Sequence, residues 1–256
     1  MSASPTERTE RSEAAIWQEV EFGSYEADLP LWRELAAAAE GPAVELGAGA
    51  GRVSLALSAE AGRELLAVEN DPELAADLEA GARRLGRSVL VIRADLAAPE
   101  TLRLPSRPAL ALGPLHVIQV LDESSRPTLL RRLGELLSPG ATIALALVDE
   151  STLLSTGTAA SQILPDMREI GGWVYSSEPL WVQVGDEVLT VRRLRERVSP
   201  DGEMERSVKD EILHRVSPDR LEAEGEQAGL RPTGSRQISS GPDEADSIVV
   251  VLEVPR

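Results

Sequence analysis

The 256-residue sequence contains no cysteine, only two histidines and few aromatic side chains, which make up 3% of it. The absence of cysteine excludes a disulfide framework, a thiolate nucleophile and a metal site built on cysteine. No apolar run approaches the roughly 20 residues that a membrane-spanning helix needs, and residues 1–13 lack the apolar segment of a secretory signal. We therefore expect a cytoplasmic protein without a membrane partner.

Basic residues are scarce relative to acidic ones. Lys and Arg number 26 against 43 Asp and Glu, which gives a formal net charge of -17. A surface of this charge repels a polyanion, and nucleic-acid-binding proteins usually carry a basic face. The nearest candidate, the four arginines within residues 192–197, has acids nearby and is interpreted as a solvated strand or strand end. Nucleic acid is therefore not an expected partner.

Hydrophobic residues make up 42% of the chain, enough for one α/β domain with a packed core. Residues 1–13 are polar and are expected to form a disordered tail that precedes a single folded domain, residues 14–256. Residues 14–40 are expected to form an N-terminal cap of two helices. Apolar and amphipathic segments alternate through residues 41–150, and because parallel strands need right-handed crossovers, this predicts a doubly wound, mostly parallel sheet.

The individual elements follow from this rhythm. The expected strands of the core lie at residues 43–46, 64–68, 89–92, 109–112 and 142–148, and the expected helices between them at 53–61, 73–85 and 127–137. Residues 171–216 instead alternate between apolar and polar, with turn signals at Gly185-Asp186 and at residues 199–202, which predicts an inserted antiparallel β meander. Residues 217–256 are expected to return to the core with a helix at 218–228 and a strand at 247–254.

The most informative segment runs from the first strand into a glycine-rich turn. We expect a tight turn at Gly47, close approach of a ligand to the backbone at Gly49 and dense packing at Gly51. A dinucleotide-binding fingerprint would place its third glycine where this chain has Arg52. Glu45 would repel a pyrophosphate but attract an ammonium group, directly or through water. The segment favours a ligand with an amino acid tail.

Acids also end the next two strands. Glu69 ends the second strand, where a carboxylate can accept both hydroxyls of a ribose. Asp95, followed by Leu96, ends the third, where a carboxylate can accept from an adenine amino group while neighbouring backbone donates to the ring. Taken singly, Glu69 could be a helix-start charge favoured by the dipole and Asp95 a turn residue. Their joint placement beside the glycine turn favours a nucleoside site.

In sequence, order and spacing, these segments resemble the S-adenosylmethionine-binding motifs of class I (Rossmann-like) methyltransferases over roughly residues 25–150. The turn at residues 137–141 also resembles the family, although Ala141 stands where the family often has a second glycine. The resemblance implies a seven-stranded-type sheet, S-adenosyl-L-methionine as cofactor and S-adenosyl-L-homocysteine as product. Transferred position by position, it implies that the cofactor is bound by Glu45, Gly47, Gly49, Gly51, Glu69, Asp95 and Leu96.

The resemblance also implies that the stretch after the fourth strand lines the pocket near the transferred methyl group. We therefore expect Gly113 to contact the cofactor and take His116 as a candidate general base, with a helix-start residue as the alternative. Tyr25 is the candidate cap over the cofactor. The alternative is that the aromatic rings of this region, Trp17, Phe22, Tyr25 and Trp32, hold the N-terminal helices onto the sheet. His214 is expected to be structural or a distant wall of the pocket, and no metal site is expected.

The meander resembles the antiparallel lid that several small-molecule N- and O-methyltransferases insert beside their active site. Its aromatics, Trp173, Tyr175 and Trp181, are either lid core or pocket lining. The sequence therefore predicts methyl transfer to N or O of a small-molecule acceptor by a monomer or homodimer. A noncatalytic S-adenosylmethionine-binding protein remains an alternative, and Glu45 and Arg52 disfavour an NAD-dependent oxidoreductase.

Overall fold

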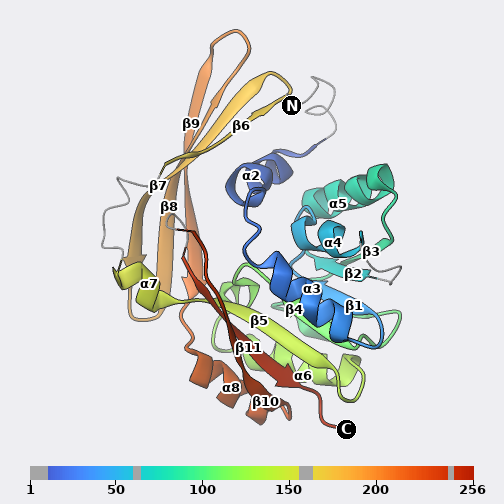
Figure 1. The fold of residues 1–256 in the computed structure, drawn as a ribbon. Coiled ribbons are helices and arrows are strands. Elements are labelled where there is room, and N and C mark those ends of the chain that lie inside the picture. The colour runs from blue at the N-terminus through green and yellow to red at the C-terminus, as the bar shows by residue number, and fades with distance from the viewer. Residues whose placement is uncertain (1–10, 60–64, 156–163, 242–244) are drawn as a thin grey trace.

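The structure is a computed structural model and describes residues 11–59, 65–155, 164–241 and 245–256. A seven-stranded sheet forms its core (Figure 1). The strands of this sheet are β1 (Ala43–Leu46), β2 (Leu65–Glu69), β3 (Val89–Arg93), β4 (Leu110–Gly113), β5 (Thr142–Val148), β10 (Arg231–Ile238) and β11 (Ser247–Glu253). Their order is β10-β11-β5-β4-β1-β2-β3, and β3-β2-β1-β4-β5 are parallel. The predicted doubly wound, mostly parallel sheet is confirmed.

Helices cover both faces of this sheet. The helices are α2 (Glu13–Phe22), α3 (Leu29–Ala38), α4 (Arg52–Leu57), α5 (Pro72–Leu85), α6 (Arg126–Leu136), α7 (Glu150–Ser155) and α8 (Pro218–Gln227), with short 3-10 helices η1 (Pro99–Thr101) and η2 (Val117–Val120). Apolar side chains of α3, α4 and α5 pack on one face, and those of α6 and α8 on the other. Burial on both faces explains why β1, β2 and β4 are apolar except at Glu45 and Glu69. None of the helices in the described ranges has both the length and the apolarity that crossing a membrane requires.

The connections reverse direction between β1 and β4. From β1 the chain continues to β2 and β3 on one side, whereas β4 and β5 follow on the other side. The loops that leave the carboxyl ends of β1 and β4 therefore diverge. In open α/β sheets this switch point is where ligands bind. It positions the glycine-rich turn and His116 at one edge of the sheet.

Two antiparallel strands complete the sheet. β11 pairs with β5 and β10 pairs with β11, both antiparallel. The sequence predicted β11 but not β10, so the C-terminal segment contains two strands rather than one. β10 lies at the edge, and only Ile238 of its eight residues is buried. An exposed edge strand needs no apolar pattern, and this one also has a register irregularity between Pro232 and Gly234.

A second sheet of four antiparallel strands stands beside the core. Its strands are β6 (Asp166–Ile170), β7 (Trp173–Val184), β8 (Val188–Val198) and β9 (Met204–His214). The predicted turns are confirmed, because Gly185 N donates to Val188 O at 2.8 Å and Ser199 N to Glu203 O at 2.9 Å. The sheet begins at Asp166 rather than at residue 171, because the unpredicted β6 precedes a turn at Gly171-Gly172 in which both residues have positive φ.

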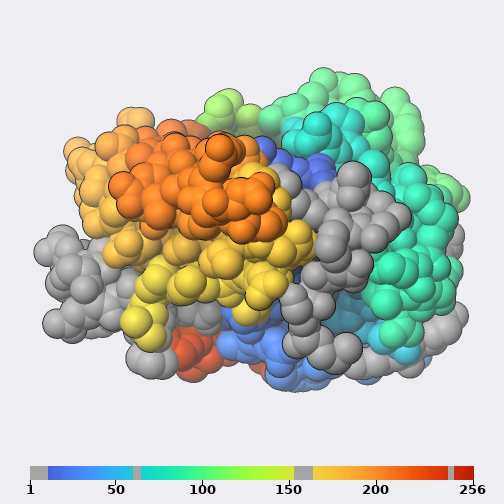
Figure 2. Space-filling model, turned by 90° about the horizontal axis from the view of Figure 1, so that it is seen from above, coloured from blue at the N-terminus to red at the C-terminus, as the bar shows by residue number. Residues whose placement is uncertain are grey.

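The folded part of the chain begins before residue 14. Ser12 is the N-cap of α2, where its Oγ accepts from Ala15 N at 3.1 Å and donates to Asp77 Oδ2 of α5 at 2.5 Å. The expected tail of residues 1–13 is therefore wrong for Ser12 and Glu13, and residues 1–10 lie outside the described residues. The helix α2 lies between the four-stranded sheet and α5, and the blue N-terminal residues are visible between these two parts in Figure 2.

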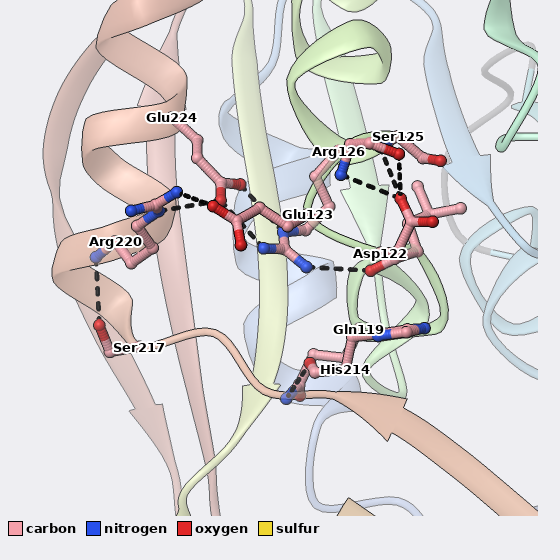
Figure 3. A network of polar contacts seen from close by, with 11 residues as sticks. Gln119, Asp122, Glu123, Ser125, Arg126, His214, Ser217, Arg220 and Glu224 are labelled. Carbon is pink, nitrogen blue, oxygen red and sulfur yellow. Dashed lines mark hydrogen bonds and ion pairs between the residues drawn. The ribbon is translucent and has the colours of Figure 1, made fainter. Parts of the chain in front are cut away.

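Polar networks fix α8 and β9 to the core (Figure 3). Arg126 of α6 donates to both carboxylate oxygens of Glu224 in α8 at 2.9 Å, and both side chains are buried. Gln119 of η2 accepts from Val148 N at 2.8 Å and donates to His214 O at 3.4 Å. Because His214 ends β9, this amide joins the four-stranded sheet to the carboxyl edge of the core.

Candidate functional site

The glycine-rich turn has a backbone that only glycine adopts easily. Gly47, Gly49 and Gly51 have φ of +64°, +57° and +95°. A Cβ on Gly51 would lie 2.1 Å from Leu78 of α5, which agrees with the dense packing expected there. A Cβ on Gly49 would lie 2.3 Å from Oε1 of Gln18 in α2. The turn is thus enclosed between α5 and α2.

The three strand-end loops meet at Glu69. Its Oε2 accepts from Gly49 N of the first loop at 2.7 Å, and its backbone oxygen accepts from Ala94 N of the third loop at 3.2 Å. Its Oε1 accepts from Asn70 N and Asp71 N, both at 2.9 Å. The structure therefore brings the predicted residues of positions 45–51, 69 and 95 to one edge of the sheet.

Asp95 and Leu96 follow β3 in different environments. Asp95 is exposed, and its Oδ1 accepts from Ala97 N at 2.8 Å, the geometry of a turn residue. Its Oδ2 accepts no hydrogen bond from the part of the chain that the structure describes. Leu96 is 8% exposed and packs in the hydrophobic core. The position of Asp95 leaves one carboxylate oxygen available to a ligand.

Glu45 lies beneath the turn rather than on its surface. The carboxyl group is 2% exposed and accepts a short hydrogen bond from Ser54 Oγ of α4. Burial raises the pKa of Glu45 to about 8, although the Ser54 hydrogen bond and the charge of Arg52 act in the opposite direction. Glu45 is therefore mostly protonated at neutral pH, and a nearby ligand cation would favour its charged form.

Arg52, the residue that departs from the dinucleotide fingerprint, holds the N-terminal segment in place. Its guanidinium forms an ion pair with the buried Asp28 at 2.5 Å and donates to Tyr25 O at 2.8 Å. It also stacks over the Tyr25 ring at 5.2 Å, and the Tyr25 hydroxyl lies 3.3 Å from Ser240 Oγ. Tyr25 is thus fixed directly above the start of α4, next to the glycine turn.

His116 follows β4 in a left-handed conformation with φ of +61°. Its Nε2 lies 3.0 Å from Ser247 Oγ at the start of β11. Burial lowers the pKa of His116 to about 4, and the charge of Asp28 opposes this only in part. The imidazole is therefore neutral near pH 7. Gly113 is buried, and a Cβ there would lie 2.7 Å from Leu145, so packing alone already requires glycine.

Aromatic residues of α2 and α3 hold these helices in place, which is the alternative considered for them. Trp17 meets Tyr175 of β7 edge to face at 5.3 Å, and Trp32 is fully buried with its Nε1 donating to Asp28. Tyr175 therefore belongs to the buried core between the four-stranded sheet and α2, as one of the two alternatives for the aromatics of the meander predicted. Trp181 instead stacks under Arg192, 4.8 Å from its guanidinium.

The arginines of β8 are more buried than a solvated strand predicts. Arg195 forms two hydrogen bonds of 2.7 Å with Glu21 of α2, whose side chain is 4% exposed. Arg193 pairs with Asp166, on the same face. Arg192 and Arg197 pair with acids of β9, Asp210 and Glu205, and Arg197 also pairs with Glu13 of α2 at 3.3 Å. The strand is confirmed, but three of its arginines, Arg193, Arg195 and Arg197, form ion pairs with acids of α2.

Several residues of this region carry no sequence signal. Gln18 accepts from Ala50 N of the glycine turn at 2.9 Å, across 32 positions of sequence. Asp28 and Ser247 are likewise recognisable only once α3 and β11 are placed beside the turn. No group of three or more potential metal-ligating side chains occurs among the described residues.

No protein-family model matches the sequence, and no curated protein matches it. Solved structures do resemble the fold. An S-adenosylmethionine-dependent methyltransferase from Clostridium acetobutylicum ATCC 824 has a TM-score of 0.70 and 12% identity, covering 95% of this chain and 98% of its own. CalS10, an amino pentose methyltransferase from Micromonospora echinaspora solved with S-adenosylmethionine bound, has a TM-score of 0.68 and 12% identity, covering 92% and 94%.

The sugar N-methyltransferase KedS8 from Streptoalloteichus sp ATCC 53650 has a TM-score of 0.69 and 16% identity, covering 94% of this chain and 91% of its own. All three similarities extend over nearly the whole of both chains, so the antiparallel sheet is part of the shared architecture. The chain has the fold of Rossmann-like S-adenosylmethionine-dependent methyltransferases, as the sequence motifs predicted.

Proposed function

We propose that this protein is an S-adenosylmethionine-dependent methyltransferase that transfers a methyl group to nitrogen or oxygen of a small molecule. The observation that carries the proposal is the meeting of three strand-end loops at Glu69, which accepts from Gly49 N at 2.7 Å and from Ala94 N at 3.2 Å. The turn, the acid and Asp95 thus share one edge, as recognition of a nucleoside with an amino acid tail requires.

The residues present are compatible with this cofactor. Gly47 and Gly49 keep the turn free of side chains of its own, and Val117 and Gln18, which lie 2.4 Å and 2.3 Å from an added Cβ on these glycines, are the side chains that a ligand meets there. Oε2 of Glu69 accepts one hydrogen bond and keeps capacity for a ribose hydroxyl, while Oδ2 of Asp95 faces an adenine amino group in this proposal. When bound, the cofactor supplies an electrophilic methyl group on sulfur.

The protein's own part in such a displacement is alignment and exclusion of water. Gln18 covers the glycine turn from α2, and β9 packs beside η2, so two elements flank the edge where His116 lies. With its pKa lowered to about 4, neutral His116 binds a proton only weakly. Orienting the acceptor therefore suits His116 better than the base role that the sequence suggested.

The printed titles of CalS10 and KedS8, an amino pentose methyltransferase and a sugar N-methyltransferase, support a small-molecule acceptor. The net charge of -17 argues against nucleic acid as substrate. Cytoplasmic location and a monomeric or homodimeric state stay predictions from the sequence.

Isothermal titration calorimetry with S-adenosylhomocysteine, S-adenosylmethionine and NAD tests the proposed cofactor. We expect binding of the first two and none of NAD. Glu69→Gln is expected to weaken binding by about tenfold or more, because it loses charge and an acceptor at the ribose. Glu79→Gln, at an exposed position of α5, is the control, and this variant is expected to bind S-adenosylhomocysteine as the wild type does.

An unchanged affinity in Glu69→Gln, or preferential binding of NAD, would contradict the site. Formation of S-adenosylhomocysteine in the presence of acceptors then separates an enzyme from a noncatalytic binding protein. Complete absence of turnover across amine and alcohol acceptors would favour the binding protein.

A further inference from the structure

The strand β9 has an inverted polarity. Val208 and Ile212 point outward and are 57% and 53% exposed, whereas Glu211, between them in sequence, is partly buried. The strand pairing shows which face Glu211 occupies. Glu211 lies opposite Val191 of β8, and Val191 and Arg195, four residues apart in that strand, lie on the same face of the sheet. Because Arg195 bonds to α2, Glu211 lies on the face that the sheet turns toward α2.

The carboxylate of Glu211 is unpaired on that face. It forms no hydrogen bond or ion pair with residues that the structure describes. The three arginines of the face are already engaged, Arg195 with Glu21, Arg193 with Asp166 and Arg197 with Glu205. Lys209, also on this face, is exposed. Burial raises the pKa of Glu211, and the negative charge of Glu21 adds to this, while Arg193, Arg195 and Lys209 oppose it. A partly buried carboxylate without a partner is unfavourable unless a ligand supplies one.

Glu211 also lies near the carboxyl edge of the core. Three residues further along β9, His214 O accepts from Gln119 of η2, and η2 directly follows His116. At about 3.3 Å per residue, Glu211 is roughly 10 Å along the strand from that contact. Leu213 lies on the same face between Glu211 and that contact, and it is buried. The carboxylate is therefore about 10 Å along β9 from the contact with η2, the element that directly follows His116.

We propose that Glu211 binds a protonated amine of the methyl acceptor, so that the acceptor of this enzyme is an amine-bearing molecule. The inference rests on the proposed function and narrows its substrate class. An ammonium group brings a positive charge and three donors to the carboxylate, whereas a hydroxyl brings one neutral donor. Because neighbouring arginines are paired elsewhere, the ligand supplies the cation that Glu211 lacks.

The test compares amines with alcohols of the same shape. The protein is first saturated with S-adenosylhomocysteine and then titrated calorimetrically with matched pairs: D-glucosamine and D-glucose, benzylamine and benzyl alcohol, and 1,4-diaminobutane and 1,4-butanediol. In the wild type we expect at least one amine to bind about tenfold or more tightly than its alcohol. Glu211→Gln, which keeps size but removes charge, is expected to abolish this preference. Glu203→Gln, in the exposed turn before β9, removes the same charge elsewhere and is expected to keep it.

Each possible result either supports or contradicts the proposed role of Glu211. The proposal is overturned if the wild type prefers no amine over its alcohol, or if Glu211→Gln keeps the preference. A separate titration of the ligand-free variant with S-adenosylhomocysteine shows whether the variant is folded. Wild-type protein that binds S-adenosylhomocysteine but shows no amine preference contradicts the role of Glu211 alone, whereas absence of S-adenosylhomocysteine binding contradicts the proposed function itself.

Discussion

The two sheets of this protein place their charged residues differently. In the seven-stranded sheet, β1, β2 and β4 are buried throughout, and their acids are Glu45, one residue before the end of β1, and Glu69, at the end of β2. In the four-stranded sheet, charged residues run along both faces of β8 and β9. Strands covered on both sides can keep polar groups only near their ends, whereas a sheet with one uncovered side can carry them along its length. The core therefore concentrates its chemistry at one edge, and the second sheet distributes it over a surface.

This difference predicts separate effects of substitution. Changes at the strand ends of the core are expected to act on cofactor binding, and changes on the inner face of the second sheet on docking of α2 and on acceptor binding. A substitution in one sheet that changed the property assigned to the other sheet would show that the two regions act as one.

The largest effect is expected from Gly49→Ala. The left-handed backbone is strained for Ala, and the contact of 2.3 Å with Gln18 Oε1 means that either the Gln18 side chain or the turn must shift. We expect S-adenosylhomocysteine to bind about 100-fold more weakly, roughly 2.7 kcal/mol, by calorimetry. Gly86→Ala is the matched control, because Gly86 has φ of +63° with nothing within 4 Å of an added Cβ. Equal loss of affinity in both variants would show that backbone strain, not the turn's surroundings, matters.

The second prediction compares two arginines of β8. Arg195→Met leaves the carboxylate of Glu21, 4% exposed, without its main partner, and we expect a loss of about 2–3 kcal/mol in the free energy of unfolding. Arg192→Met removes the exposed pair with Asp210 and is expected to lower the free energy of unfolding much less, because water screens an exposed ion pair. Urea unfolding measures both. A similar cost for the two variants would refute the asymmetry between inner and outer faces.

The third prediction concerns His116. Asn tolerates the left-handed conformation of this position, so His116→Asn removes the imidazole with little backbone strain. We expect kcat for the best amine acceptor to fall about tenfold while affinity for S-adenosylhomocysteine stays within about twofold, the signature of lost acceptor alignment. Ser247→Ala, which removes the contact at Nε2, is expected to have a smaller effect of the same kind. Full activity in His116→Asn would remove any role in the reaction.

The smallest effect is a pH dependence. Because the folded pKa of Glu45 is about 8 against 4.5 for the free side chain, the folded protein holds more protons between these values, and stability falls as pH rises through that window. Glu45→Gln lacks this titration, so its Tm relative to the wild type is expected to be higher at pH 7 than at pH 6 by roughly 3–5 °C. Glu79→Gln, at an exposed position, serves as control. Parallel Tm profiles for Glu45→Gln and wild type would contradict the raised pKa.

Elements with strong periodicity could be predicted closely. The strand over residues 142–148 was predicted with the bounds that the structure has, and β8 lies between the two predicted turns. The strand β10 and the short strand β6 could not be predicted, because their side chains are mostly exposed or charged and show no apolar alternation. The helix α7 is likewise short, and its six residues contain too little apolar periodicity to predict a helix.

The candidate site divides in the same way. The glycine turn, Glu69 and Asp95 were recognisable because each follows a buried strand, and parallel strands bring their carboxyl ends together in any such fold. Gln18, Asp28 and Ser247 were not, because each reaches the site through a contact over long sequence separation. The lowered pKa of His116 also depends on how deeply the fold buries it.

The sequence by itself determined the alternation of strands and helices, the acidic charge and the placement of glycines and acids at strand ends, because these depend on local periodicity and backbone freedom. Only the tertiary structure decided which face of β9 is covered, which arginines are already paired and which carboxylates are left without a partner. Those properties depend on the docking of α2 against a sheet that begins more than 140 residues later in the chain, and pairing of charges is a property of the assembled surface rather than of any one segment.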